Sequence, residues 1–137
     1  MVSGLSKDQL ELVDKAERIA RECLAPRAHD VDAAGVNPKE SWHDVWQNGL
    51  LTLGVPKEHS GLGLDMLTYV MVIEKLAGGC TNTGMTVHMH STVMRFIEAL
   101  GTDKQKSAFY PEVVDGGNLF GSWGSEPETR GSTAMRY

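Results

Sequence analysis

Two histidines two positions apart, in "VHMHS", are the side chains of this sequence that most readily suggest a metal ion. Imidazole is a common metal ligand, but several ligands must converge on one ion. His88 and His90 fall in a stretch with helical spacing, where residues two apart point about 200° apart. No HExxH or ExxH pattern follows them. We therefore expect no metal site, with one histidine facing a pocket and the other facing solvent.

Glu74 is a carboxylate inside the most apolar stretch of the sequence, "YVMVIEKLA". A carboxylate buried among apolar side chains can serve as a general base. It can also pair with an arginine, such as Arg95, or reach the surface. The sequence favours one of these two structural roles.

Methionines are frequent in the apolar segments and could line an adaptable pocket, because the thioether fills irregular spaces. We interpret them instead as mostly core residues. They are Met66, Met71, Met85, Met89 and Met94.

Two glycine-containing segments could approach a ligand closely with their backbones. The first, "HSGLGLD" over 59–65, follows no strand and lacks the GxGxxG spacing, so it predicts a turn rather than a dinucleotide site. The second, over 119–132, combines glycines with hydroxyl side chains, and Pro127 holds Glu126 extended. From its chemistry alone, this second segment is either a phosphate- or ring-edge-binding loop or a plain surface turn.

The composition narrows the class of protein. The 137 residues carry a formal net charge of −5 with acids and bases interspersed, which disfavours nucleic acid as a partner. Cys23 and Cys80 are far apart and form no CxxC pattern, which fits a reducing compartment. No apolar run approaches the roughly 18 residues of a membrane span. We expect a soluble cytoplasmic protein without a membrane segment.

Helix-start signals and helical spacing organise the elements that must position these residues. Ser6 with Gln9, and Thr102 with Gln105, form capping-box patterns, and Asp65 can cap the apolar stretch after it. The expected helices run from Ser6 to a break or kink at Pro26, over 26–33, from Asn37 as cap to Asn48, over 66–78, over 84–99, and from Thr102 to Val114. We expect 50–65 to be a loop packed on the core.

These elements predict an all-α fold, an up-down bundle of about six helices with a short β or irregular C-terminal tail. The helix over 66–78 is apolar nearly all round and should be central. The predicted domains are a helical bundle over 1–117 and the start of a β domain over 118–137.

Segments along the whole chain, taken in order, resemble the N-terminal part of the acyl-CoA dehydrogenases, the FAD-dependent flavoenzymes that desaturate acyl-CoA thioesters. They are "ARECLAPRAHDVDAAGVNPKESW" (20–42), "NGLLTLGVPKEHSGLGLD" (48–65), "VIEKLAGGCTNTGMTVHMHS" (72–91), "LGTDKQKSAFYPEVVDGG" (100–117) and "GSEPETRGST" (124–133). The last is similar to the family's Ser/Thr-Glu-Pro-x-x-Gly-Ser-Asp signature. In that family a β domain and a second helical bundle follow the first, and the flavin sits among the three.

The resemblance implies roles for particular residues. Trp123, Gly124 and Ser125 would lie along the isoalloxazine edge of FAD, and Ser132 would lie near the CoA moiety. The wall of the acyl pocket would include Met71, Thr86, His90 and Met94. The family's catalytic glutamate belongs to the later bundle, so no residue here is assigned that role, and we expect little or no turnover from this chain.

Two alternatives stay open at this stage. Three residues separate Pro127 from Gly131 where the signature has two, and Thr133 replaces its Asp, which leaves room for a flavin-dependent monooxygenase of the same fold. The chain could also be a non-enzymatic helical bundle that binds a partner or itself. Either way, a homo-oligomer is expected, because apolar faces that other domains would cover drive association.

Overall fold

The computed structural model describes residues 4–122, and six α-helices carry most of this range. They are α1 (Lys7–Ile19), α2 (Ala25–Ala34), α3 (Lys39–Gln47), α4 (Met66–Gly79), α5 (Thr81–Leu100) and α6 (Asp103–Val114). A π-helical turn, η1 (Ala20–Leu24), joins α1 to α2, and two 3-10 turns, η2 (Leu50–Thr52) and η3 (Lys57–His59), lie between α3 and α4. No strand occurs within 4–122. The all-α expectation is confirmed.

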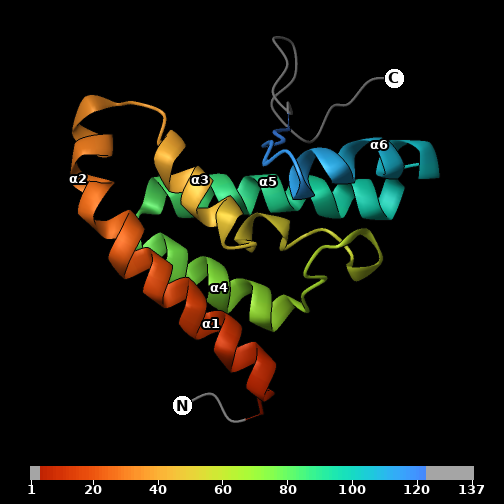
Figure 1. Ribbon diagram of the computed structural model, residues 1–137, viewed down its shortest axis with the longest axis horizontal. Coiled ribbons are helices and arrows are strands. Elements are labelled where there is room, and N and C mark those ends of the chain that lie inside the picture. Colours follow the sequence, from red (N-terminus) through yellow and green to blue (C-terminus); the bar gives the residue numbers. More distant parts are fainter. Residues whose placement is uncertain (1–3, 123–137) are drawn as a thin grey trace, which may run out of the picture.

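α4 lies between α1 and α5, as Figure 1 shows, so the prediction of a central position for this helix is confirmed. α5 is the longest helix and packs against α4 on one side and α6 on another. The centre of the core is formed by side chains of all these elements. Its fully buried members include Leu24, Val45, Val72, Leu76, Val87, Met94 and Val113.

The predicted helix N-termini are confirmed where a side chain can reach the free N–H groups of the first turn. Ser6 and Thr102 each form a complete capping box, and the Asp65 carboxylate accepts the Thr68 N–H at 3.0 Å. The expected cap at Asn37 is wrong. The third helix begins one residue later, behind Pro38, which has no side chain able to cap it.

Pro26 kinks the chain without interrupting the helix. It is the second residue of α2, and the five-residue turn η1 precedes it directly, so the chain stays helical from α1 to α2. A π turn and a proline are both recognised causes of a helix bend. Figure 1 shows α1 and α2 running in different directions.

The segment after α3 enters the core, as predicted. Leu50, Leu51, Leu53 and Val55 are fully buried, and the two short turns η2 and η3 satisfy part of the backbone polar groups. This segment lies against α5, where it becomes part of the site described below.

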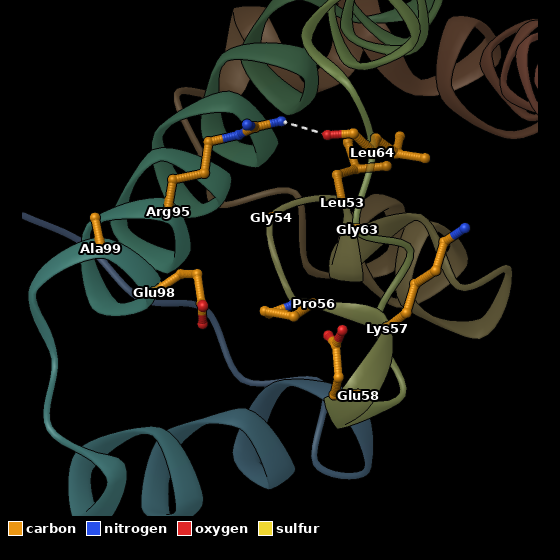
Figure 2. Close-up of a pocket in the computed structure, with 10 residues that line it drawn as sticks. All are labelled: Leu53, Gly54, Pro56, Lys57, Glu58, Gly63, Leu64, Arg95, Glu98 and Ala99. Atoms are coloured by element: carbon orange, nitrogen blue, oxygen red, sulfur yellow. Dashed lines mark hydrogen bonds between the residues drawn. The ribbon is translucent and has the colours of Figure 1, made fainter.

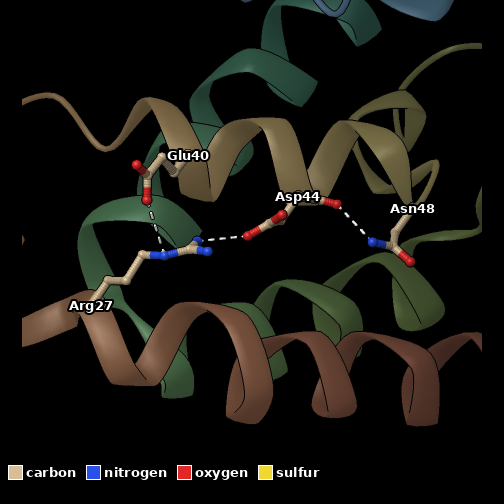
Figure 3. Close-up of polar contacts among 4 residues, drawn as sticks. All are labelled: Arg27, Glu40, Asp44 and Asn48. Atoms are coloured by element: carbon tan, nitrogen blue, oxygen red, sulfur yellow. Dashed lines mark hydrogen bonds and ion pairs between the residues drawn. The ribbon is translucent and has the colours of Figure 1, made fainter.

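An ion-pair cluster ties α2 to α3 (Figure 3). The Arg27 guanidinium lies 2.6 Å from an Asp44 carboxylate oxygen and 3.4 Å from a Glu40 carboxylate oxygen. The Asn48 amide donates to the Asp44 carbonyl oxygen at 2.9 Å, so the end of α3 is held by the same residue. The cluster fixes α3 beside the bend that Pro26 introduces.

Candidate functional site

An apolar groove between α4 and α5 is the strongest candidate for a ligand site. It forms a cavity of about 340 Å³ between two helices joined by the tight turn at Cys80. Its lining residues are Tyr69, Val70, Ile73 and Ala77 of α4 and Thr81, Gly84, Met85 and His88 of α5. Grooves of mostly apolar lining with a few polar groups are typical of small-molecule sites.

Small residues set the depth of this groove at its narrow end. A Cβ atom added at Gly84 would lie 2.6 Å from the Ala77 Cα, closer than real side chains come. Glycine at this position therefore lets the backbones of α4 and α5 approach. The two helices are held together here, while Tyr69 and His88 line the groove nearer the other end of α4.

Three side chains form a polar chain at the groove. The Tyr69 hydroxyl lies 2.7 Å from His88 Nδ1, and burial raises the pKa of the Tyr69 phenol. The Arg95 guanidinium carbon lies 4.5 Å from the centre of the Tyr69 ring, within the range of a cation–π contact. Arg95 also donates to the Leu64 carbonyl oxygen at 3.3 Å.

His90, two residues on, belongs to the core. It is 1% exposed, its Nε2 lies 3.1 Å from the Leu51 carbonyl oxygen, and its Nδ1 accepts the Phe120 N–H at 2.9 Å. Burial lowers the pKa of His90 to about 4. Since Nδ1 is an acceptor, the proton is on Nε2, and the neutral imidazole holds the chain leaving α6 against α5.

The histidine prediction is therefore half right. His88 lines the groove, but His90 is buried rather than turned to solvent. The helical argument that separates them is borne out, because the two rings point to different sides of α5. Within the described residues, no group of three or more His, Cys, Asp or Glu side chains could hold a metal ion.

A second cavity, of about 490 Å³, lies where the chain leaves the bundle. Its lining residues are Trp42, Asn82, Met85, Thr86, Met89, Leu119, Phe120 and Gly121. The Trp42 indole Nε1 is buried and has no hydrogen-bond partner. A buried donor without a partner is uncommon in folded proteins and marks a place where an acceptor can bind.

A third cavity, of about 640 Å³, opens between the 50–65 segment and the end of α5 (Figure 2). Figure 2 shows that its arginine, Arg95, extends toward Leu64 rather than across the cavity. Its Glu98 carboxylate accepts the Tyr110 hydroxyl at 2.7 Å and pairs with Lys106 at 3.3 Å. Glu98 is committed to these structural partners and one Arg95 nitrogen to the Leu64 carbonyl oxygen, while the Arg95 Nε is buried without a partner, so we treat this cavity as a weaker candidate than the groove.

The residues predicted to form the acyl wall are not gathered at the groove. Thr86 lines the second cavity, Met71 packs partly buried against the core, and Met94 is fully buried in it, as His90 is. Trp123, Gly124, Ser125 and Ser132 lie outside the described residues. The roles assigned to all eight stay predictions.

Two other interpretations of the sequence are resolved. Glu74 is exposed, and Arg95 contacts Tyr69 and Leu64 instead, so the surface alternative for Glu74 is confirmed. The core assignment of the methionines is wrong for three of them. Met66, Met85 and Met89 are 58%, 58% and 42% exposed, respectively.

Sequence reasoning considered two of the groove residues, His88 as a metal ligand and Met85 as a pocket or core residue, and missed the others as site residues. Tyr69 and Val70 lie within the helix predicted over 66–78, and Gly84 is the first residue of the helix predicted over 84–99. A usable signal was present in Ala77 and Gly84, because small residues on facing helices permit close contact.

No helix of the described part is long and apolar enough to cross a membrane.

Comparison with known proteins identifies a family with the same helical fold. A family model described as "Acyl-CoA dehydrogenase, N-terminal domain" matches residues 6–117, most of the chain. The chain belongs to the acyl-CoA dehydrogenase family. The matched range contains all six α-helices and both walls of the groove.

Individual relatives agree with this assignment. The chain is 27% identical over 129 residues to the mitochondrial isovaleryl-CoA dehydrogenase of Pongo abelii, which covers 92% of this chain and 30% of that protein. It is 30% identical over 128 residues to the (2S)-methylsuccinyl-CoA dehydrogenase of Cereibacter sphaeroides, covering 93% of this chain and 23% of that protein.

A solved structure shows the same fold. The butyryl-CoA dehydrogenase of Megasphaera elsdenii superposes with a TM-score of 0.75 at 24% identity, over 87% of this chain and 32% of that one. The chain thus spans about a third or less of the length of these relatives, and it carries the helical N-terminal domain of the family.

Proposed function

We propose that this chain supplies the acyl-binding part of an FAD-dependent acyl-CoA dehydrogenase, which desaturates the α,β bond of an acyl-CoA thioester in the complete enzyme. The observation that carries the proposal is the apolar groove between α4 and α5, in a chain whose residues 6–117 match the family. An acyl group is an apolar chain of variable length, and a groove between two packed helices can bury it.

The chain's own residues would bind the acyl group and exclude water from it. Val70, Ile73 and Met85 offer apolar surface, and Ala77 with Gly84 closes one end of the groove. We assign removal of the α-proton to none of the described carboxylates. Glu74, the carboxylate nearest in sequence to the groove residues, is exposed.

The second cavity supports a place for the flavin edge. Trp42 has a buried indole donor without a partner, and it lines this cavity together with Phe120 and Gly121, which are separated by one residue from the predicted flavin-edge residues. A mostly apolar cavity with a buried free donor fits the edge of a planar heterocycle that carries acceptor atoms. When bound, FAD would supply the hydride acceptor; Trp42 would orient its edge, with Trp123, Gly124 and Ser125.

The acyl wall predicted from the resemblance is a weaker proposal than the groove. Thr86 could still border a ligand from the side of the second cavity. His90 and Met94 would act through the packing of α5 rather than by contact, since both are fully buried. A soluble cytoplasmic location, likewise, stays a prediction from composition.

Binding of hexanoyl-CoA, measured by isothermal titration calorimetry, tests the proposal. Val70 lines the groove and is 51% exposed, so Val70→Trp should fill the groove without overpacking the core. We expect it to weaken binding by about tenfold or more, which is a loss of about 1.4 kcal/mol. The matched control is Leu67→Trp, also on α4 and 51% exposed, which does not line the groove.

Wild-type binding that Leu67→Trp keeps and Val70→Trp loses would support the groove. Equal loss in both variants, or no binding by the wild type, would contradict it. Flavin binding is tested separately, by the absorbance spectrum of the purified protein. A yellow protein would support retained cofactor binding at the second cavity. Acyl-CoA-dependent dye reduction by this chain would contradict the expectation of little or no turnover.

A second candidate is self-association, favoured by one observation. The exposed apolar residues of α5 are Met85, Met89, Phe96 and Leu100, and their spacing of four, seven and four residues places them on one stripe of the helix. A stripe of this kind along a whole helix favours a covering partner. We propose a second copy of the chain as that partner.

A further inference from the structure

The groove between α4 and α5 is apolar except at one place, where Tyr69 and His88 face each other across it. The only other hydroxyl among its lining residues, that of Thr81, lies 3.4 Å from the Ala77 carbonyl oxygen of the preceding turn. Any polar recognition within the groove therefore falls to the Tyr69–His88 pair. This is unusual chemistry for a surface meant only to hold a hydrocarbon chain.

We assign the free nitrogen of His88 from the shorter of the two contacts that the Tyr69 hydroxyl makes, 2.7 Å to Nδ1 against 3.4 Å to the His88 carbonyl oxygen. The Tyr69 hydroxyl lies 2.7 Å from Nδ1, and burial favours the protonated phenol over the phenolate. A phenol that donates to Nδ1 leaves the proton of the neutral imidazole on Nε2. No hydrogen bond joins Nε2 of the half-buried His88 to another described residue, so with this tautomer Nε2 is a donor that a ligand in the groove can use.

Arg95 holds Tyr69 in the position that this requires. Its guanidinium lies over the Tyr69 ring at 4.5 Å and is anchored by the Leu64 carbonyl oxygen at 3.3 Å. Figure 2 shows Arg95 reaching from α5 to Leu64, whose carbonyl oxygen accepts its hydrogen bond. A ring held on one face by Arg95 keeps its hydroxyl directed at His88.

We propose that His88 is a specificity-determining residue, which donates a hydrogen bond from Nε2 to an oxygen carried on the acyl chain of the substrate. The preferred acyl-CoA thioesters are therefore those with a carbonyl or carboxylate oxygen along the acyl chain, in addition to the thioester carbonyl. Tyr69 and Arg95 are positioning residues for this donor. The inference rests on the proposed function, since it names the substrate class of the same groove.

The preference follows from the cost of an unpaired donor. A plain hydrocarbon chain in the groove would displace water from Nε2 and leave the N–H without an acceptor. An acyl oxygen at the right depth restores that hydrogen bond. A net hydrogen bond of ordinary strength corresponds to about fivefold in affinity.

The test compares hexanoyl-CoA with its 4-oxo and 5-oxo analogues, in which a ketone replaces one methylene. Calorimetric titration of the 137-residue chain should show at least one analogue binding about fivefold tighter than hexanoyl-CoA. His88→Leu should remove this preference, and Tyr69→Phe should reduce it. His88→Gln keeps an N–H donor and should restore part of it.

A matched control is His29→Leu, because His29 is exposed on α2 and lines no part of the groove. It should leave the preference unchanged. A spectroscopic readout separates the hydrogen bond from packing: in nitrogen-15 spectra, the His88 Nε2 signal should shift with the oxo analogue and not with hexanoyl-CoA.

Equal affinities of all three thioesters for the wild type would overturn the inference and leave the proposed function standing. So would a preference that survives in His88→Leu. If none of the three binds the wild type, the proposed function fails, and the inference fails with it.

Discussion

At the scale of single residues, His90 of α5 is hydrogen-bonded to two other parts of the chain. Its Nε2 donates to the Leu51 carbonyl oxygen of the 50–65 segment, and its Nδ1 accepts the Phe120 N–H at the start of the C-terminal segment. The imidazole must be neutral to make both contacts. The acyl-wall role of His90 stays a prediction, and its contacts in the structure make it a link between three parts of the chain.

Acidification should therefore destabilise the fold through His90. The unfolded chain protonates this histidine below about pH 6.5, but the native state, whose His90 pKa is about 4, does not. The unfolded state then binds more protons, so the free energy of unfolding falls between pH 6.5 and 4, by about 3 kcal/mol at most. Urea unfolding at several pH values measures this.

His90→Gln separates this effect from other titrations. Glutamine can donate and accept but does not titrate, so the slope between pH 6.5 and 4 should flatten. Asp65 acts in a lower window, because its hydrogen bond from Thr68 lowers its pKa to about 2, and its contribution is lost only below pH 3.8. An unchanged slope in His90→Gln, equal to that of an exposed-site control, His29→Gln, would refute the assignment.

At the scale of elements, the α4–α5 pair depends on close backbone contact. Gly84→Ala places a Cβ 2.6 Å from the Ala77 Cα and should destabilise the fold by about 1–3 kcal/mol. Gly78→Ala is the matched control, since nothing lies within 4 Å of its added Cβ and it also sits in a helix. It should stabilise the fold slightly, by about 0.5 kcal/mol.

Urea denaturation of both variants provides the measurement. Two destabilised variants would mean that alanine is poorly tolerated here for a reason other than contact. Two stabilised variants would mean that α4 and α5 are not held as closely as the structure places them.

The helices also show how much of the structure can be predicted from the sequence. Capping boxes at Ser6 and Thr102 were predictable because each is a local pattern within four residues. The reach of Gln9 to Asp65 and Thr68, at 2.9 and 2.7 Å, was not, since it joins residues 56 and 59 positions apart. Local patterns therefore predicted the helices and their order but not which side chains meet across them.

The groove illustrates the same limit. Helical periodicity separates His88 from His90 by direction, and that part was predictable. Which of the two faces a cavity depends on the packing of α4 against α5, and hence on Gly84 and Ala77. The exposed methionines were mistaken for core because an apolar stripe predicts burial but does not say which partner buries it.

At the scale of the whole molecule, the exposed stripe of α5 predicts self-association. Sedimentation velocity should show the wild type as a dimer or larger, and the double substitution Phe96→Glu with Leu100→Glu should shift it to the monomer. These two side chains are 56% and 83% exposed, so charge there does not disturb the core.

The matched control places the same charges off the stripe, at Leu10 and Val36, which are 45% and 54% exposed on other parts of the surface. It should stay associated. A monomeric wild type, or dissociation of both double variants alike, would remove the stripe as an interface between copies.

Amide chemical-shift mapping with hexanoyl-CoA tests most directly whether an acyl chain lies between α4 and α5. We expect the largest shifts on groove residues of both helices, including Val70, Ile73, Gly84 and His88. Shifts centred on Trp42 and Phe120, on the Arg95–Glu98 cavity, or nowhere in the described bundle would contradict it.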